Sequence, residues 1–416
     1  MTPTLQILSG DFDEWPAFAD TPTCQPFDPL AVELLDSLSR HLVRDAETRT
    51  EPELIALAFW LRRANLEQLA AGVVPGKGDL LLAPRGTVFH ITPSNVPTIG
   101  FYSWSLSLLA GNRNIVRVSS RASGQTDRLL LALNTVLEED RFAPFRASNL
   151  FVTYAAQSGV TETISGMTDV RVIWGGDESV RAIRAVPIPP ASIELTFADR
   201  YSVAAIDASG WLAIDAMQRD EGVRRFLNDS LSFAQMACSS PRILYWIGDA
   251  DTVERARHDF WTRASRIEAS APSRLTGADY VNKLVVADSL AIDFDVVTER
   301  SDDGALVRVW SDSAYLPMSA HCGGGLYFEH RIESLAALLP RLDAKVQTLS
   351  YAGIADEVVR AFLASLRGRG VDRAVPFGSA LDFAAVWDGF DLLRSLTRTI
   401  HYVRDRLLSP QSPEEN

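Results

Sequence analysis

Residues 86–120 read GTVFHITPSNVPTIGFYSWSLSLLAGNRNIVRVSS. A β-prone run at 86–91 is followed by two prolines, a helical pattern at 98–109 and a second β-prone run at 114–118. A strand, a crossover helix and a second strand make a βαβ unit, which joins parallel strands. The stretch therefore predicts a parallel sheet that is covered by helices.

The same alternation continues on both sides of this unit. Two helical patterns come before it, and strand-like and helical runs alternate after it as far as residue 196. A second α/β series follows, which predicts a second sheet. We therefore expect N-terminal helices and a first α/β domain over 1–200, a second α/β domain over 201–385, a C-terminal helix over 386–408 and a disordered tail over 409–416.

Composition limits the class of protein. The chain has 416 residues, of which 47% are hydrophobic and 22% charged, as in ordinary globular proteins. Its formal charge of −13 argues against non-specific nucleic-acid binding. Three cysteines do not suggest a disulfide framework, and neither a secretory signal nor a stretch that could span a bilayer is visible. These features predict a cytoplasmic protein without a membrane span.

Three turns after predicted strands carry polar groups or glycines. Asn95 follows the strand at 86–91, where its side-chain NH₂ can serve an oxyanion, although Ser94 or Asn95 can equally cap the next helix. Arg117-Val-Ser-Ser120 combines arginine and hydroxyl groups suited to a phosphate ester, or it is an exposed loop. Gly175-Gly176 lets a ligand approach the backbone, but it is not a GxGxxG loop.

Cys238 is the strongest candidate nucleophile. It lies among small residues in FAQMACSSPR (233–242), so its thiolate would be open to an acyl substrate. Most lone intracellular cysteines are inert, and Cys322, beside His321, is a rival. Adjacent residues of an extended chain point to opposite sides, which places His321 poorly as a base for Cys322. Cys24 is interpreted as incidental. The six scattered histidines predict no metal site.

Taken in order, several segments resemble one family, the acyl-CoA reductase (LuxC-like) branch of the aldehyde dehydrogenase superfamily. The resemblance spans about residues 80–400 and rests on HITPSNVP, LLAGNRNIVRVSS, VIWGGDES, SIELTFADRYSVAAID, QMACSSPR, VQTLSYAG and VPFGSALDFAAVWDGFDLLRSLTR. It implies an α/β, aldehyde-dehydrogenase-like fold. The domain over 1–200 would be a Rossmann-type cofactor domain and the domain over 201–385 the catalytic one, with the active site in the cleft between them.

The resemblance also implies roles for three residues. Cys238 resembles the superfamily nucleophile, and Asn95 resembles the side chain of its oxyanion hole, with the cysteine N–H as second donor. Glu194 resembles the general base of aldehyde-oxidising relatives, but it is followed by Leu-Thr-Phe instead of Leu-Gly-Gly. A reductase must not activate water against its acyl-enzyme. We therefore interpret Glu194 as a candidate proton donor to the nascent aldehyde.

The cofactor loop points to NADPH. Where the superfamily often has Lys-Pro-Ser-Glu, this chain has Arg117-Val-Ser-Ser120, which removes a carboxylate that would repel a 2′-phosphate and supplies an arginine. A charged hydrogen bond is worth about 1.5–3 kcal/mol, so NADP is favoured by roughly tenfold or more. The expected cofactor contacts are Thr92, Pro93, Ser94, Arg117, Ser119 and Ser120, with Gly175 and Gly176 at the nicotinamide end.

The expected function is NADPH-dependent reduction of an acyl thioester to an aldehyde through acyl-Cys238. An aldehyde dehydrogenase working oxidatively, a cysteine acyltransferase or thioesterase without redox activity, and a catalytically silent scaffold are alternatives. The resemblance implies long-chain acyl groups, delivered as acyl-CoA or by an acyl carrier protein or acyl-protein donor. It further implies an acyl-protein synthetase or thioesterase partner and self-association.

Overall fold

The chain divides into two α/β units. A computed structural model describes residues 5–73, 80–93, 96–119, 124–270, 275–312, 316–368 and 370–403. The first unit consists of the chain up to Ala198, Phe383–Val386 and the segment from Phe390. The second unit consists of Asp199–Asp382 and Trp387–Gly389. Residues 383–385 were predicted with the second domain. They pack with the first because the Phe383 ring stacks on Tyr102, with centroids 5.0 Å apart.

The first unit is built on a six-stranded sheet in the order β1-β5-β4-β3-β6-β7, in which only β1 is antiparallel to its neighbour. Its strands are β1 (Gln6–Ser9), β3 (Thr87–Ile91), β4 (Arg113–Arg117), β5 (Asn149–Thr153), β6 (Val170–Trp174) and β7 (Ile193–Phe197). Its helices up to residue 198 are α1 (Trp15–Asp20), α2 (Pro29–Arg44), α3 (Pro52–Trp60), α4 (Arg63–Val73), α5 (Pro97–Leu109), α6 (Gly124–Leu137), α7 (Ala143–Ser148), α8 (Val160–Ser165) and α9 (Asp177–Arg184).

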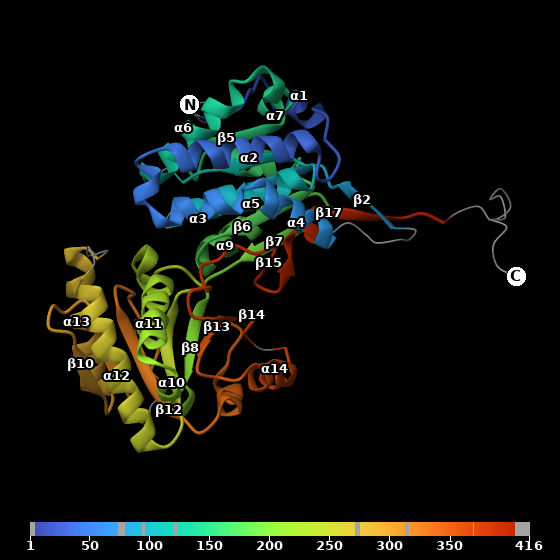
Figure 1. Ribbon diagram of the computed structural model, residues 1–416. Coiled ribbons are helices and arrows are strands. Elements are labelled where there is room, and N and C mark those ends of the chain that lie inside the picture. The colour runs from blue at the N-terminus through green and yellow to red at the C-terminus, as the bar shows by residue number, and fades with distance from the viewer. Residues whose placement is uncertain are drawn as a thin grey trace, which may run out of the picture. The chain divides into compact units, whose positions relative to one another are not determined.

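Helix α5 explains the apolar stretch in the middle of this unit. It begins with Pro97, whose fixed φ suits the first helical position, and every residue from Thr98 to Leu109 is buried. The helix contacts β3 and β4 as well as α2 and α3, which lie over it in Figure 1. A helix that is covered on all sides needs no polar face.

The strand order of the first unit reverses between β3 and β6. From the central β3 the chain moves outward to β4 and β5, then returns to β6 and β7 on the other side. In open α/β sheets such a reversal leaves a crevice at the carboxyl ends of the two strands, where ligands bind. The segments after β3, β4 and β6 meet at this edge.

The second unit has a seven-stranded sheet in the order β10-β11-β12-β9-β8-β13-β14. All pairs are parallel except β10 with β11. Its strands are β8 (Tyr201–Asp207), β9 (Pro241–Ile247), β10 (Val297–Arg300), β11 (Val307–Trp310), β12 (Leu326–Ile332), β13 (Val346–Ala352) and β14 (Arg373–Pro376). Its helices are α10 (Ala208–Ala213), α11 (Ala216–Leu231), α12 (Ala250–Ala269), α13 (Gly277–Asp293) and α14 (Asp356–Ser365).

The predicted C-terminal helix over 386–408 was wrong. The segment forms the short strands β15 (Val386–Trp387) and β16 (Phe390–Asp391), helix α15 (Leu392–Leu396) and strand β17 (Thr397–His401). Strand β17 pairs antiparallel with β2 (Leu80–Pro84), apart from the main sheet. The helical spacing of the leucines ends at Leu396, and the β-branched residues after it favour a strand once a partner is present. The predicted tail over 409–416 lies outside the described residues.

No helix in the described part of the chain is long and apolar enough to cross a membrane.

Candidate active site

Cys238 follows an unusual left-handed turn at the amino end of β9. In the 3-10 turn η3 (Ser232–Gln235), Phe233, Ala234 and Gln235 have φ of 53°, 49° and 64°. Each such conformation of a non-glycine residue costs roughly 1 kcal/mol or more and persists only where the surroundings impose it. Strain of this kind directly before a predicted nucleophile marks the segment as a candidate functional site.

The Gln235 side chain imposes this turn. Its Nε2 donates to the carbonyl oxygens of Pro241 and Leu326, both at 2.9 Å, and its Oε1 accepts from the Gly325 N–H at 3.0 Å. Gln235 is fully buried. The amide thereby ties the turn to the first residues of β9 and β12 and fixes the backbone that carries Cys238.

Ser202 fixes the Cys238 backbone from the neighbouring strand. Its hydroxyl donates to the Cys238 carbonyl at 2.7 Å and accepts from the Thr348 N–H at 3.1 Å. The register of β8 shifts here against both of its neighbours, between Ser202 and Val203 and between Val346 and Leu349. Such irregularities redirect side chains, and they are common beside active sites.

The Cys238 thiol is half-buried in polar surroundings. Gln347 Nε2 donates to its sulfur at 3.1 Å. Burial raises the pKa of the thiol to about 11, and the charge of Asp388 adds to this, while the Gln347 hydrogen bond, Arg200 and Arg242 oppose it. The free protein therefore holds a protonated thiol at neutral pH, instead of the thiolate expected from sequence, and deprotonation must accompany attack on a substrate.

The two other cysteines have less favourable settings. His321 accepts from the Gly323 N–H through Nδ1 at 3.1 Å, and its Nε2 lies 2.9 Å from the Leu326 carbonyl oxygen. Both ring nitrogens are thus engaged by the backbone, which leaves none for Cys322. Burial raises the pKa of Cys322 and raises that of Cys24 to about 11, as it does that of Cys238, so thiol acidity does not distinguish the three cysteines.

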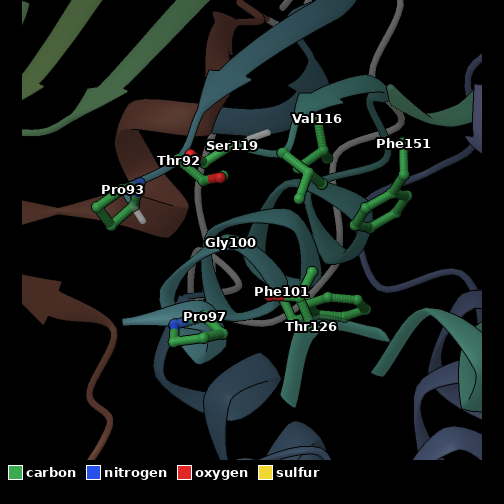
Figure 2. A pocket seen from close by; sticks show the side chains of 10 residues that line it. Thr92, Pro93, Pro97, Gly100, Phe101, Val116, Ser119, Thr126 and Phe151 are labelled. Atoms are coloured by element: carbon green, nitrogen blue, oxygen red, sulfur yellow. The ribbon is translucent and has the colours of Figure 1, made fainter. Parts of the chain in front are cut away.

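At the carboxyl edge of the first sheet, the structure brings together three of the predicted cofactor contacts. Thr92, Pro93 and Ser119 line one pocket, whose apolar lining includes Phe101 and Phe151 (Figure 2). The Thr92 hydroxyl donates to the Arg117 carbonyl at 2.9 Å and so joins the ends of β3 and β4. The predicted residues Ser94, Asn95 and Ser120 lie outside the described residues.

Arg117 ends β4 with its guanidinium 4.9 Å from the centroid of the Tyr154 ring. Its buried Nε has no hydrogen-bond partner among the described residues. A guanidinium carries a fork of N–H donors that matches a phosphate, and this one has an N–H that no described residue accepts. The side chain is therefore suited to an anionic ligand.

The Gly175-Gly176 turn follows β6, the strand beside β3. The Gly175 N–H donates to the Phe197 carbonyl at 3.1 Å, and Gly176 is the N-cap of α9. The first turn of α9 carries Asp177 and Glu178. Because acidic side chains disfavour a second anion at that helix end, this turn suits an uncharged part of a ligand better than a phosphate.

Glu194 does not lie at the carboxyl edge of the first sheet. It lies near the amino end of β7, paired in register with Arg171 of β6. Its Oε2 accepts from Arg171 Nε at 2.7 Å and its Oε1 from Arg184 Nε at 2.9 Å. Arg171 is buried. Both carboxylate oxygens are thus occupied by guanidinium groups, an arrangement that joins neighbouring elements of the first unit and does not resemble that of a proton donor.

The sequence did not predict several residues that shape the pocket of the first unit and the surroundings of Cys238. A Cβ on Gly100 of α5 would lie 2.9 Å from Thr92 Cγ2, so this glycine lets the helix approach the pocket. Gln235, Ser202 and Gln347 hold Cys238 from three segments of the chain. Only Gln235, three residues before the cysteine, lies close enough to have been noticed.

In the described residues, no group of three or more histidine, cysteine, aspartate or glutamate side chains is arranged to hold a metal ion.

Residues 80–399 match the family model described as acyl-CoA reductase (LuxC). The chain is similar to the long-chain acyl-protein thioester reductase of Aliivibrio fischeri, with 28% identity over 167 residues, or 40% of this chain and 33% of that protein. It is 27% identical to the enzyme of the same description from Vibrio harveyi over 168 residues, again 40% of this chain and 33% of the relative. These similarities span about a third of the relatives' length.

Solved structures show the fold. Methylmalonate-semialdehyde dehydrogenase from Oceanimonas doudoroffii superposes with a TM-score of 0.66 at 14% identity, covering 95% of this chain and 89% of that one. The aldehyde dehydrogenase of Mycobacterium tuberculosis complexed with NAD+ gives a TM-score of 0.64 at 11% identity, with the same coverage. The predicted aldehyde-dehydrogenase-like α/β fold is confirmed.

Proposed function

The chain belongs to the acyl-CoA reductase (LuxC) family, and from this premise we propose that it reduces an acyl thioester to an aldehyde with NADPH, through an acyl intermediate on Cys238. The similarity to long-chain acyl-protein thioester reductases supports a long-chain donor, carried by CoA, by an acyl carrier protein or by another protein. One observation carries the assignment of the nucleophile: the Cys238 thiol is half-buried among polar groups and accepts a hydrogen bond from Gln347.

In the proposed reaction the Cys238 thiol loses its proton as the sulfur attacks the thioester carbonyl carbon. The Cys238 N–H and the Asn95 side chain stabilise the resulting oxyanion. The bond between this carbon and the donor sulfur then breaks, the donor thiol takes up a proton, and acyl-Cys238 remains. NADPH, when bound, supplies the hydride that reduces the acyl carbonyl carbon. The oxygen is transiently protonated, and loss of that proton with cleavage of the carbon–sulfur bond releases the aldehyde and the Cys238 thiolate.

We propose that the dinucleotide binds at the carboxyl edge of the first sheet. The pocket there has apolar side chains from Phe101 and Phe151 and hydroxyl groups from Thr92 and Ser119. Arg117 lies between the pocket-lining Val116 and Val118, so it faces the other side of β4, over Tyr154, at the same edge of the sheet. Arg117 would hold a 2′-phosphate, with Ser119 and Ser120 as further donors. Ser94 and Pro93 would contact the cofactor from the end of β3, and Gly175 and Gly176 would lie against its nicotinamide end.

The setting of Glu194 favours reduction over the oxidative alternative. Release of a free acid needs a base that activates water against acyl-Cys238. Arg171 and Arg184 occupy the carboxylate oxygens of Glu194, which makes it a poor base. We therefore do not retain the proton-donor role for Glu194.

We also propose a cytoplasmic location and a protein partner that delivers the acyl group, namely an acyl carrier protein or an acyl-protein synthetase. Self-association belongs to the same proposal, because it is common in the superfamily that the sequence resembles.

The test begins with acyl labelling. Wild-type protein is incubated with a radiolabelled long-chain acyl-CoA or acyl carrier protein, the label is located by peptide mapping, and NADPH is then added. We expect the label on the Cys238 peptide and its release as aldehyde. Cys238→Ala should abolish labelling, whereas the matched variant Cys322→Ala should retain it. Labelling that persists in Cys238→Ala, or release of free acid instead of aldehyde, would contradict the proposal.

The cofactor assignment has its own test. Arg117→Leu should weaken NADPH binding about tenfold, because it removes a charged hydrogen bond worth about 1.5–3 kcal/mol, and should leave NADH binding nearly unchanged. Tryptophan fluorescence quenching by each nucleotide measures both affinities. Equal loss for NADPH and NADH would place Arg117 outside the 2′-phosphate site.

A further inference from the structure

The Gln347 amide links the Cys238 sulfur to a buried ion pair. Both N–H groups of its Nε2 are used, one on Cys238 Sγ at 3.1 Å and one on Asp388 Oδ1 at 2.6 Å. Its Oε1 accepts from the Thr348 hydroxyl at 3.1 Å. Because the Asp388 carboxylate accepts and does not donate, it fixes which end of the amide faces the sulfur.

Arg200 holds Asp388 in place. Its Nη1 lies 3.3 Å from Asp388 Oδ1 and 2.5 Å from Asp372 Oδ2. Its Nη2 donates to the Val346 carbonyl at 2.9 Å, directly before Gln347 in the chain. The Arg200 and Asp388 side chains are only 11% and 6% exposed, so solvent screens their interaction weakly. A buried guanidinium, a buried carboxylate and an amide therefore form one chain that ends at the sulfur.

We propose that Gln347 is a positioning residue, whose amide directs the Cys238 sulfur and donates a hydrogen bond to it during attack, and that Asp388 and Arg200 hold this amide in the donating orientation. The inference rests on the proposed function, since it assigns a role in the use of Cys238 as nucleophile. It adds Arg200, directly before β8, Gln347 of β13 and Asp388 of the 387–389 segment to that site.

Packing alone does not account for this arrangement. A neutral thiol is a weak acceptor, so an amide N–H that donates to it contributes little to the stability of the resting protein. The same bond becomes about twice as strong when the sulfur carries charge. The amide therefore acts mainly on the thiolate that exists during attack.

The groups around the sulfur shift the pKa of Cys238 in opposite directions, so two substitutions should change it in opposite senses. Burial and the Asp388 charge raise the pKa of Cys238, while the Gln347 hydrogen bond, Arg200 and Arg242 lower it. Asp199 acts on Arg242 in turn. Loss of the amide should therefore make the thiolate rarer, and loss of the Asp388 charge should make it more abundant.

The experiment measures alkylation of Cys238 by iodoacetamide, read on the Cys238 peptide by mass spectrometry so that Cys24 and Cys322 do not interfere. Well below the pKa, the thiolate fraction changes tenfold for each unit of pKa, and the rate changes by roughly threefold because a more basic thiolate is the better nucleophile. At pH 8.5 we expect Gln347→Leu to react severalfold more slowly than wild type. Asp388→Asn keeps an acceptor oxygen for the Gln347 amide but loses the charge, and it should react severalfold faster. Rate profiles from pH 7.5 to 9.5 should shift in the same two directions.

Ser350→Ala is the matched control. Ser350 lies on the same strand, is fully buried, and its hydroxyl has no hydrogen-bond partner in the described part of the chain. Its alkylation rate should stay within twofold of wild type. A Gln347→Leu protein that keeps its fold by circular dichroism and alkylates at the wild-type rate would overturn the inference, as would Asp388→Asn moving in the same direction as Gln347→Leu.

Acyl labelling separates the two proposals. If wild-type Cys238 takes up the acyl group and Gln347→Leu does so at an unchanged rate, the inference fails and the proposed function stands. If the alkylation rates shift as expected but Cys238 accepts no acyl group, the proposed function fails and the linkage between Gln347 and the sulfur stands.

Discussion

Replacement of Gln235 by leucine tests whether a single side chain holds the turn before Cys238. Leucine has a similar size but no polar atoms. The variant therefore leaves the Pro241 and Leu326 carbonyls and the Gly325 N–H without the bonds that Gln235 provides. No water can replace the amide without a rearrangement, because Gln235 is completely buried.

The size of the effect follows from the groups that lose their partner. The Leu326 carbonyl keeps the His321 Nε2 donor at 2.9 Å, so the Pro241 carbonyl and the Gly325 N–H are the two groups left unsatisfied. At about 1–3 kcal/mol for each buried group, they cost roughly 2–6 kcal/mol. Burying the apolar leucine side chain returns about 1.5–3 kcal/mol. The left-handed turn also relaxes once its restraint is gone, which recovers roughly 1 kcal/mol for each residue that leaves the strained region. We expect the free energy of unfolding to fall by about 1–2 kcal/mol.

Urea unfolding followed by circular dichroism measures this change, and iodoacetamide alkylation of Cys238 reports the local effect. The released turn should expose the sulfur, so alkylation at pH 8.5 should become faster than in wild type. Gln218→Leu is the control, because the Gln218 side chain accepts from the Asp215 N–H at an exposed helix end and its loss should cost no more than about 1 kcal/mol. A Gln235→Leu protein within about 0.5 kcal/mol of wild type, which is the scatter expected of such measurements, would refute the reasoning.

Three further predictions concern the rest of the chain. Glu194→Gln should lower the free energy of unfolding by about 1–3 kcal/mol, because the buried Arg171 loses a charged hydrogen bond. Acyl labelling should remain, and loss of labelling in a folded variant would restore a catalytic role. Gly100→Ala should weaken NADPH binding severalfold in fluorescence titrations, since the added methyl group meets Thr92; unchanged affinity would place the cofactor elsewhere. Burial raises the pKa of Asp229 to about 7, so its contribution to stability is complete below pH 4 and is lost as pH rises through 7. Urea midpoints at pH 5 and 8 should therefore differ less in Asp229→Asn than in wild type.

The fold was largely predictable because its signal is local. Residues 86–120 contain two strands, the helix between them and the turns that join them, so periodicity alone identifies the βαβ unit. The error at the C-terminus has the opposite origin. Thr397–His401 becomes a strand only because Leu80–Pro84 lies beside it, more than 300 residues earlier in the chain. No window of sequence contains both partners.

The residues of the candidate site also fall into those with a local sequence signal and those without one. Thr92, Pro93 and Ser119 were found because each directly follows a predicted strand. Gln347 was not, because its relation to Cys238 exists only after two strands have packed on either side of β8. Glu194 shows the converse limit: its place in a motif was recognised, but the two arginines that occupy its carboxylate come from elements that the motif does not include.

The high pKa of Cys238 bears on the direction of the proposed reaction. When two thiols compete to leave a tetrahedral intermediate, the one with the lower pKa leaves faster. An ordinary donor thiol has a pKa of about 8.5, and burial raises that of Cys238 to about 11. The donor thiol should therefore depart, and the acyl group should stay on the protein. The same property would hinder release of the aldehyde, when Cys238 itself must leave as a thiolate. A hydrogen bond from Gln347 that strengthens as negative charge develops on the sulfur lowers that second barrier without removing the advantage in the first step.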